Sequence, residues 1–136
     1  MDYKIDYAVK RRDERGFLVD FLKGDEIDNK DTRLGQIYFV TFEKQHAIRG
    51  NHFHKTKNEW FVVVQGRIQV VLEDVKTKEK KTLIISGEND TYERIFVGKN
   101  VAHAFSNITP SAMMINYADK PYHQESTDTI PYILID

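Results

Sequence analysis

Short segments of alternating apolar and polar residues, separated by turns, make up most of this chain. Between residues 59 and 73 the pattern breaks at Gly66, and after it Ile68, Val70 and Leu72 share one face of a predicted strand. Further strands are predicted at 35–42, 82–85, 94–97, 113–117 and 132–135. No long stretch has the 3.6-residue apolar period of an amphipathic helix. The pattern therefore predicts an all-β protein.

Many short strands in a chain of 136 residues favour an architecture that limits exposed sheet edges, either a barrel or a double-sheet jelly roll. The length is typical of one domain, and no internal repeat or linker-like segment divides the chain. We therefore expect a single domain over residues 1–136.

The amino-acid composition excludes several classes of function for this chain. The chain is 40% hydrophobic with a net charge of −1, so it is predicted to fold and has no basic stripe for nucleic acid or a membrane surface. It has no cysteine, which excludes disulfides and thiolate sites. The first residues lack the apolar segment of a signal peptide or membrane helix, so we expect a cytoplasmic protein with neither nucleic acid nor membrane as a partner.

Residues 50–66 hold the densest group of chemically useful side chains. His52 and His54 stand two apart, so on a strand both side chains leave the same face. Glu59 follows after a polar break, and His103 lies in a second cluster. Buried polar groups need partners, which makes an ordinary core a poor setting for the pair. If these side chains converge in a β-barrel, they can hold a metal or move protons on a substrate.

The spacing of these residues resembles the two cupin motifs. From His52 to Gly66 the chain reads His-x-His, four residues, Glu, six residues, Gly, which resembles the first motif. His103 followed four residues later by Asn107 resembles the second, although Phe96 stands about where a proline is usual. The resemblance implies a cupin-type double-stranded β-helix, that is, a jelly-roll barrel with little helix.

Two further segments resemble enzymes that act on nucleotide-linked deoxysugars. The run from Arg15 to Phe21 resembles the N-terminal signature of the dTDP-4-keto-rhamnose 3,5-epimerase superfamily. The run from Arg49 to Lys55 resembles a segment of the dTDP-4-keto-6-deoxyglucose 3,4-ketoisomerases. The 3,5-epimerases carry glutamine in place of His54, and they extend well beyond position 136 to supply the aspartate of their His–Asp dyad. These departures favour the ketoisomerases.

The ketoisomerase resemblance implies an enzyme that moves the ketone of a dTDP-linked 4-keto-6-deoxyhexose from C4 to C3 through an enediolate, in deoxyaminosugar biosynthesis for surface glycans. It assigns the acid and base roles to His52 and His54, without saying which serves which carbon. No cofactor is expected, because the oxidation is internal to the sugar. Arg49 and Lys55 are candidates to stabilise the enediolate or to bind the diphosphate. The candidate substrate-binding residues are Arg15, Tyr38, Arg49, Lys55, His103 and Tyr117.

Two alternatives stay open. Ketoisomerases tend to lack an acidic residue at the position of Glu59, and residues 52–59 also resemble the cupin domain of bifunctional capsular-polysaccharide enzymes, which can hold zinc. In that case His52, His54, Glu59 and His103 are the metal ligands, for an isomerase or an oxygenase. The second alternative is a non-catalytic sugar-binding cupin. The nucleotide and the stereochemistry at C4 of the product also stay open.

A homodimer is expected, because cupins of this superfamily commonly exchange N-terminal strands. Residues 1–10 mix apolar and charged residues and have no obvious hairpin partner in the sequence.

Overall fold

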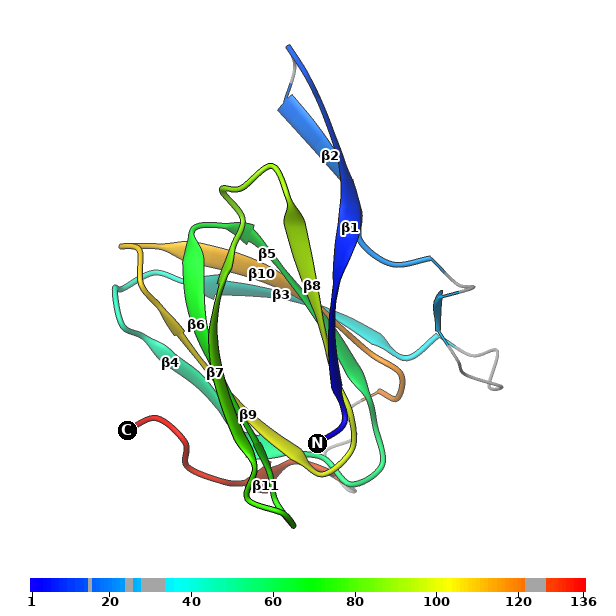
Figure 1. The fold of residues 1–136 in the computed structure, drawn as a ribbon, viewed down its shortest axis with the longest axis vertical. Coiled ribbons are helices and arrows are strands. Elements are labelled where there is room, and N and C mark those ends of the chain that lie inside the picture. Colours follow the sequence, from blue (N-terminus) through cyan, green and yellow to red (C-terminus); the bar gives the residue numbers. More distant parts are fainter. Residues whose placement is uncertain (15, 24–25, 28–33, 122–126) are drawn as a thin grey trace.

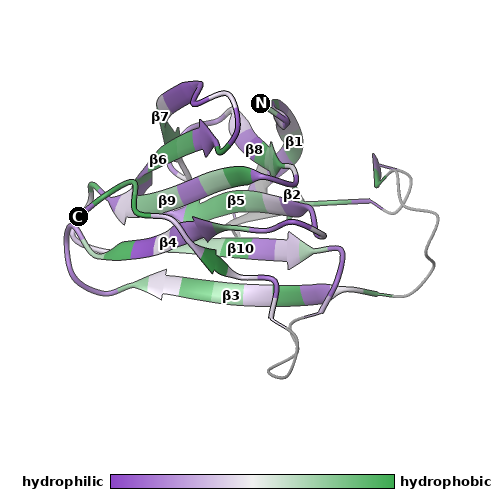
Figure 2. Ribbon diagram, turned by 90° about the horizontal axis from the view of Figure 1, so that it is seen from below, coloured by the Kyte–Doolittle hydropathy of each residue, from purple (hydrophilic) through white to green (hydrophobic). Residues whose placement is uncertain are grey.

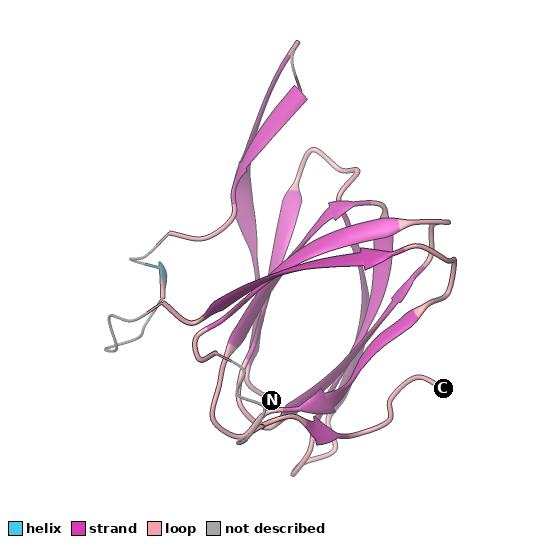
Figure 3. Ribbon diagram, turned by 180° about the vertical axis from the view of Figure 1, so that it is seen from behind, coloured by secondary structure: helices cyan, strands magenta, loops and turns pink. Residues whose placement is uncertain are grey.

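The computed structural model describes the chain except for residues 15, 24–25, 28–33 and 122–126. The described residues form two antiparallel sheets that face each other and enclose the interior (Figure 1). They include no α-helix, and helical geometry is limited to a short turn at Glu26 (Figure 3). The predicted all-β, cupin-type jelly roll is confirmed. No helix in the described part of the chain has the length and apolar character needed to cross a membrane.

The strand order of the larger sheet is β2-β1-β8-β5-β10-β3, and that of the smaller sheet is β11-β4-β9-β6-β7. The larger sheet contains β1 (Tyr3–Asp13), β2 (Gly16–Asp20), β3 (Gln36–Phe42), β5 (Glu59–Gln65), β8 (Tyr92–Val97) and β10 (Ala112–Ala118). The smaller sheet contains β4 (Ile48–Phe53), β6 (Arg67–Asp74), β7 (Lys80–Ser86), β9 (Val101–Asn107) and β11 (Ile130–Pro131).

The alternating pattern found most of the strands that form the core. The predicted break at Gly66 separates β5 from β6, and Ile68, Val70 and Leu72 lie on the buried face of β6, as predicted. Figure 2 shows apolar and polar residues alternating along several strands. Apolar side chains from both sheets meet between them, and their burial stabilises the sandwich.

The predicted strand at 132–135 is wrong. The last strand is β11, which ends at Pro131, and proline has no N–H to continue the ladder. The residues beyond it are held instead by Asn51, whose Oδ1 accepts hydrogen bonds from the N–H groups of Leu134 and Ile135. These hydrogen bonds hold the C-terminal segment next to β4.

The N-terminal segment does have hairpin partners. β1 pairs with β2 through contacts such as Val9 opposite Asp20, and with β8 through contacts such as Ile5 opposite Ile95. The reason given for expecting strand exchange is therefore wrong, because short-range sequence patterns do not show the distant pairing with β8. The homodimer itself stays a prediction.

Arg94 ties the outer face of the larger sheet to the segment after β2. Its guanidinium donates two hydrogen bonds to Asp6, at 2.9 and 2.7 Å, one of 2.6 Å to Glu26 and one of 2.9 Å to the carbonyl of Phe21. The hydrogen bonds from Arg94 hold the pKa of Asp6 below its usual range against the opposing effect of burial. The pKa of Glu26 is lowered by the backbone N–H of Lys23 and then by Arg94.

Replacing Arg94 by methionine is expected to flatten the acid side of the stability profile. Because the folded pKa of Asp6 and of Glu26 lies below the unfolded one, the unfolded state binds more protons, so both groups stabilise the fold above about pH 4 and lose this effect as the pH falls. Urea unfolding at a series of acidic pH values measures the slope. An unchanged slope in R94M would contradict the assignment.

Candidate functional site

A β-bulge in β4 aims the first histidine into the interior. The register of β4 against β9 shifts between Gly50 and His52, which places His52 opposite His103. Gly50 and Asn51 have φ values of 85° and 57°. A Cβ on Gly50 would lie 2.7 Å from the carbonyl oxygen of His103, so both the backbone angle and the close approach favour glycine.

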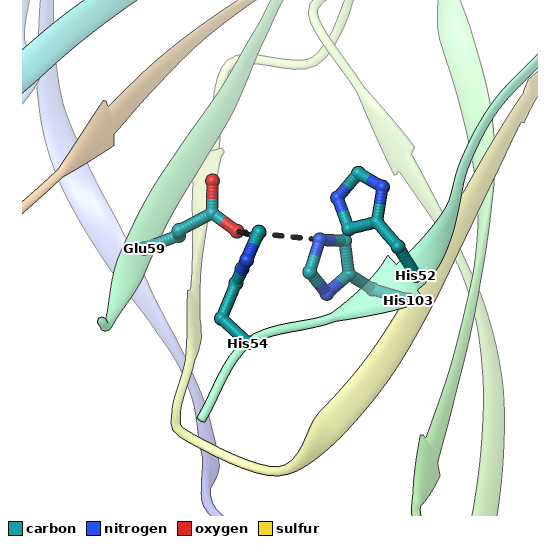
Figure 4. A group of neighbouring side chains, drawn as sticks. All are labelled: His52, His54, Glu59 and His103. Carbon is teal, nitrogen blue, oxygen red and sulfur yellow. Dashed lines mark ion pairs between the residues drawn. The ribbon is translucent and has the colours of Figure 1, made fainter. Parts of the chain in front are cut away.

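Four side chains, three from strands and one from the residue directly after a strand, converge in the interior (Figure 4). His52 and His54 come from β4 and the residue after it, Glu59 begins β5, and His103 lies on β9. One nitrogen or oxygen from each lies within 4.8 Å of the others. The ring of His52 lies 4.9 Å from that of His54 and 4.7 Å from that of His103, centroid to centroid. The predicted convergence of these residues is therefore present.

Backbone carbonyls fix the orientation of two of the imidazoles. Nδ1 of His54 lies 2.8 Å from the carbonyl oxygen of Asp128, and Nδ1 of His103 lies 3.1 Å from that of Val101. A carbonyl can only accept, so Nδ1 carries the proton in both rings. The two Nε2 atoms then face the same oxygen, Oε1 of Glu59, at 2.8 and 3.3 Å.

Glu59 is a buried carboxylate held in its charged form. Burial opposes its ionisation, but the contacts with His103 and His54 outweigh this and hold the pKa of Glu59 well below its usual range. Its Oε2 accepts a hydrogen bond of 2.7 Å from the amide of Asn116. Its Oε1 has the two ion pairs but no well-aligned hydrogen bond among the described residues.

His52 is uncharged at neutral pH. The pKa of His52 is lowered to about 4, mainly by burial and then by the neighbouring His103 and His54, against the opposing charge of Glu59. A neutral imidazole offers a lone pair to a proton or to a metal ion. His52 is therefore available as a base or as a ligand.

These side chains line a cavity of about 230 Å³ between the two sheets. Its apolar lining comes from Val40, Phe61, Phe105 and Met114. Its polar lining comes from Tyr38, Arg49, Gly50, His52, His54, Lys57, Glu59, His103, Asn116 and Thr129. A cavity with an apolar part and several inward-facing polar groups is typical of a ligand site.

Most of the residues predicted from sequence line this cavity. His52, His54, His103 and Tyr38 do so, and Arg49 does so from an exposed position in which its Nε donates to the carbonyl of Thr41.

Two of the predicted site residues lie elsewhere, and a third cannot be placed because it is not among the described residues. Tyr117 is on the opposite face of β10, where its ring packs against Trp60, because side chains alternate along a strand. The side chain of Lys55 is exposed and outside the cavity, because the chain turns after His54. Arg15 lies outside the described residues.

Sequence reasoning missed three residues of the site. Asn116 could have been found from the alternation of β10, since it shares a face with the buried Met114. Lys57 lies in an irregular turn, where no period indicates which side chains point inward. Asp128 supplies the carbonyl that orients His54, and its carboxylate accepts hydrogen bonds from the N–H groups of residues 55 and 56. No local pattern in the sequence reveals that long-range contact.

Comparison with known proteins gives a family and a curated relative. The family described as polysaccharide biosynthesis C-terminal domain matches residues 11–130. The spore coat polysaccharide biosynthesis protein SpsL of Bacillus subtilis is 28% identical over 120 residues, which cover 84% of this chain and 76% of SpsL.

Solved structures share the fold. A 3,4-ketoisomerase from Helicobacter canadensis is 28% identical, with a TM-score of 0.75 over 96% of this chain and 90% of its own. The capsular polysaccharide assembling protein CapF of Staphylococcus aureus is 23% identical, with a TM-score of 0.69 over 93% of this chain. This chain spans 34% of the length of CapF, and that likeness concerns the fold alone. The predicted resemblance to cupin-type sugar enzymes is confirmed.

Proposed function

Because this chain belongs to the polysaccharide biosynthesis C-terminal domain family, we propose that it is a nucleotide-sugar isomerase that moves the ketone of a dTDP-4-keto-6-deoxyhexose from C4 to C3. The observation that carries the proposal is the convergence of His52 and His54 on one cavity between the sheets. The likeness to the Helicobacter canadensis 3,4-ketoisomerase over nearly the whole of both chains supports the reaction type.

The reaction needs one base, one acid and a place for negative charge. Removal of the proton from C3 sends the electron pair of the C3–H bond into a C3–C4 double bond, and O4 becomes the oxyanion of an enediolate. The hydroxyl proton then passes from O3 to O4, the ketone forms at C3, and a proton is delivered to C4. No external oxidant is consumed, since C3 is oxidised as C4 is reduced.

We assign these two proton transfers to His52 and His54. His52 is neutral, so it is available to take the C3 proton. His54 presents Nε2 at 2.8 Å from Oε1 of Glu59, and its ring is oriented by the carbonyl of Asp128 through Nδ1. We assign to His54 the delivery of the proton to C4.

The size of the cavity indicates that only part of the substrate enters it. Sites for drug-sized ligands occupy roughly 300–1,000 Å³, and this cavity of about 230 Å³ is smaller. The sugar is therefore the part that enters, and the nucleotide stays at the mouth. Arg49 is exposed there, and its guanidinium is well shaped to bind a diphosphate.

Incubation of the purified protein with dTDP-4-keto-6-deoxyglucose in deuterated water tests the proposal. Proton NMR should show the ketone at C3 and deuterium at the carbons that exchange. Washout at C5 instead would indicate epimerisation, and binding without exchange would indicate a sugar-binding module. Either result would overturn the isomerase assignment.

A metal site is a second candidate, favoured by the contact at Glu59. Two imidazoles whose Nδ1 atoms donate to carbonyls present their Nε2 lone pairs to a carboxylate oxygen that lacks a well-aligned hydrogen bond. Such facing lone pairs repel unless a proton or a cation lies between them, and fixed Nδ1 donors are typical of metal-binding histidines. The residues that would hold the metal are His52, His54, Glu59 and His103. A bound Zn²⁺ would supply Lewis-acid polarisation of a carbonyl oxygen.

Adding Zn²⁺ to chelator-treated protein is expected to raise its thermal stability if this site binds metal. At free zinc about 100 times the dissociation constant, the gain is about 2.7 kcal/mol. Glu59→Gln should weaken zinc binding in calorimetry by at least about 10–100-fold, the loss typical of residues that only support a metal ligand, because here a charged ligand itself is lost. Glu43→Gln, at an exposed position, is the matched control. Equal zinc affinity in E59Q and the wild type would exclude this site.

A further inference from the structure

Lys57 is a buried cation that the proton transfers leave without a role. Its side chain is only 5% exposed, and it lines the cavity from the turn between His54 and Glu59. Within the described part of the chain, its ammonium takes part in no hydrogen bond or ion pair. Its positive charge nevertheless reaches the site, because it contributes to the lowered pKa of His52.

An ammonium that lines a cavity, and that has no hydrogen bond or ion pair with another described residue, is available to bind a negatively charged group there. The nearest buried carboxylate does not compensate it, because Oε1 of Glu59 faces His54 and His103 and its Oε2 is bonded to Asn116. A cation kept in such a place indicates an anionic partner that arrives with the ligand. The cavity is the space into which that partner would fit.

We propose that Lys57 binds the oxygen of the sugar that becomes negative when the ketone moves. This inference rests on the proposed isomerase function and adds to it the group that stabilises the intermediate. As the C3–H bond breaks and its electron pair enters the C3–C4 double bond, the charge that develops on O4 is met by the ammonium of Lys57. The O3 proton then passes to O4 as the negative charge passes to O3, and no electron leaves the sugar.

This role differs from the one that the sequence suggested for a lysine. Lys55 belongs to the ketoisomerase-like segment, but its side chain is exposed and outside the cavity. Lys57 is two residues later, and its positively charged side chain lines the cavity. The structure therefore moves the oxyanion-binding role from Lys55 to Lys57.

The test compares Lys57→Met with the wild type in the deuterium-exchange assay. Loss of a preorganised oxyanion donor costs about 10²–10³ in kcat, so exchange at C3 should fall by at least about 100-fold. The affinity for dTDP alone should stay unchanged, because the diphosphate is bound elsewhere. The thermal midpoint should not fall, since the substitution removes no hydrogen bond or ion pair to another described residue and keeps a side chain of similar length. Lys99→Met, at an exposed turn position, is the matched control.

Each possible result of this test distinguishes between different roles of Lys57. A wild-type rate in K57M, or a loss of rate in Lys55→Met instead, would overturn the inference while leaving the isomerase function intact. Weaker dTDP binding in K57M would assign Lys57 to the diphosphate and overturn it too. A lower thermal midpoint in both K57M and Lys57→Gln would indicate a purely structural role. Absence of exchange in the wild type would overturn the proposed function and, with it, the role of Lys57.

Discussion

Replacement of His52 or His54 by asparagine is expected to lower turnover of dTDP-4-keto-6-deoxyglucose by about two or more orders of magnitude. Both imidazoles line the cavity, where His52 offers a neutral nitrogen and His54 a nitrogen beside Glu59. Asparagine keeps a polar side chain of moderate size but cannot exchange a proton near neutral pH. Steady-state rates and deuterium incorporation at C3 and C4 measure the effect separately for each variant.

The two variants should also differ from each other. If His52 removes the C3 proton, H52N should lose exchange at C3. If His54 delivers the proton to C4, H54N should keep residual exchange at C3 with little product. His46→Asn is the control, because His46 is exposed at a turn with φ of 62°, a backbone angle that asparagine tolerates well. A near-normal rate in either site variant would remove that residue from the mechanism.

The sequence predicted the features that follow from a strict two-residue period. The inward face of β6, the shared face of His52 and His54, and the break at Gly66 are all local consequences of alternation. The same alternation explains one wrong prediction. Tyr117 was chosen for its hydroxyl group, but the neighbouring residue Asn116 is the one that faces the cavity.

The features that could not be predicted depend on irregular backbone or on distant contacts. The bulge at Gly50 and Asn51 sets the pairing of His52 with His103, and nothing in the alternation reveals it. The turn after His54 decides that Lys57 faces the cavity while Lys55 faces solvent, and that turn is held by Asp128 from the end of the chain. The histidines of the site were therefore easier to identify than the groups that surround them.

Asn107 shows how one residue of the second cupin-like motif serves the fold. Its side chain is fully buried, at 0% exposure. Its Oδ1 accepts a hydrogen bond of 2.9 Å from the N–H of Ala47, and its Nδ2 donates to the carbonyls of Lys44 and Thr109 at 2.9 and 2.8 Å. It thus joins the end of β9 to the turn that leads into β4, the strand that carries His52.

Asn107→Leu is therefore expected to destabilise the protein by about 3 kcal/mol, because a side chain of similar size leaves one buried N–H and two carbonyls without their partner. Urea unfolding measures the loss, and the thermal midpoint should fall by roughly 6–12 °C, at about 2–4 °C for each kcal/mol. Asn89→Leu, at an exposed position between β7 and β8, is the matched control and should change stability by less than about 0.5 kcal/mol. If the free energy of unfolding of N107L stayed within that same margin, the three hydrogen bonds of Asn107 would not hold the turn before β4, and another contact would have to position His52.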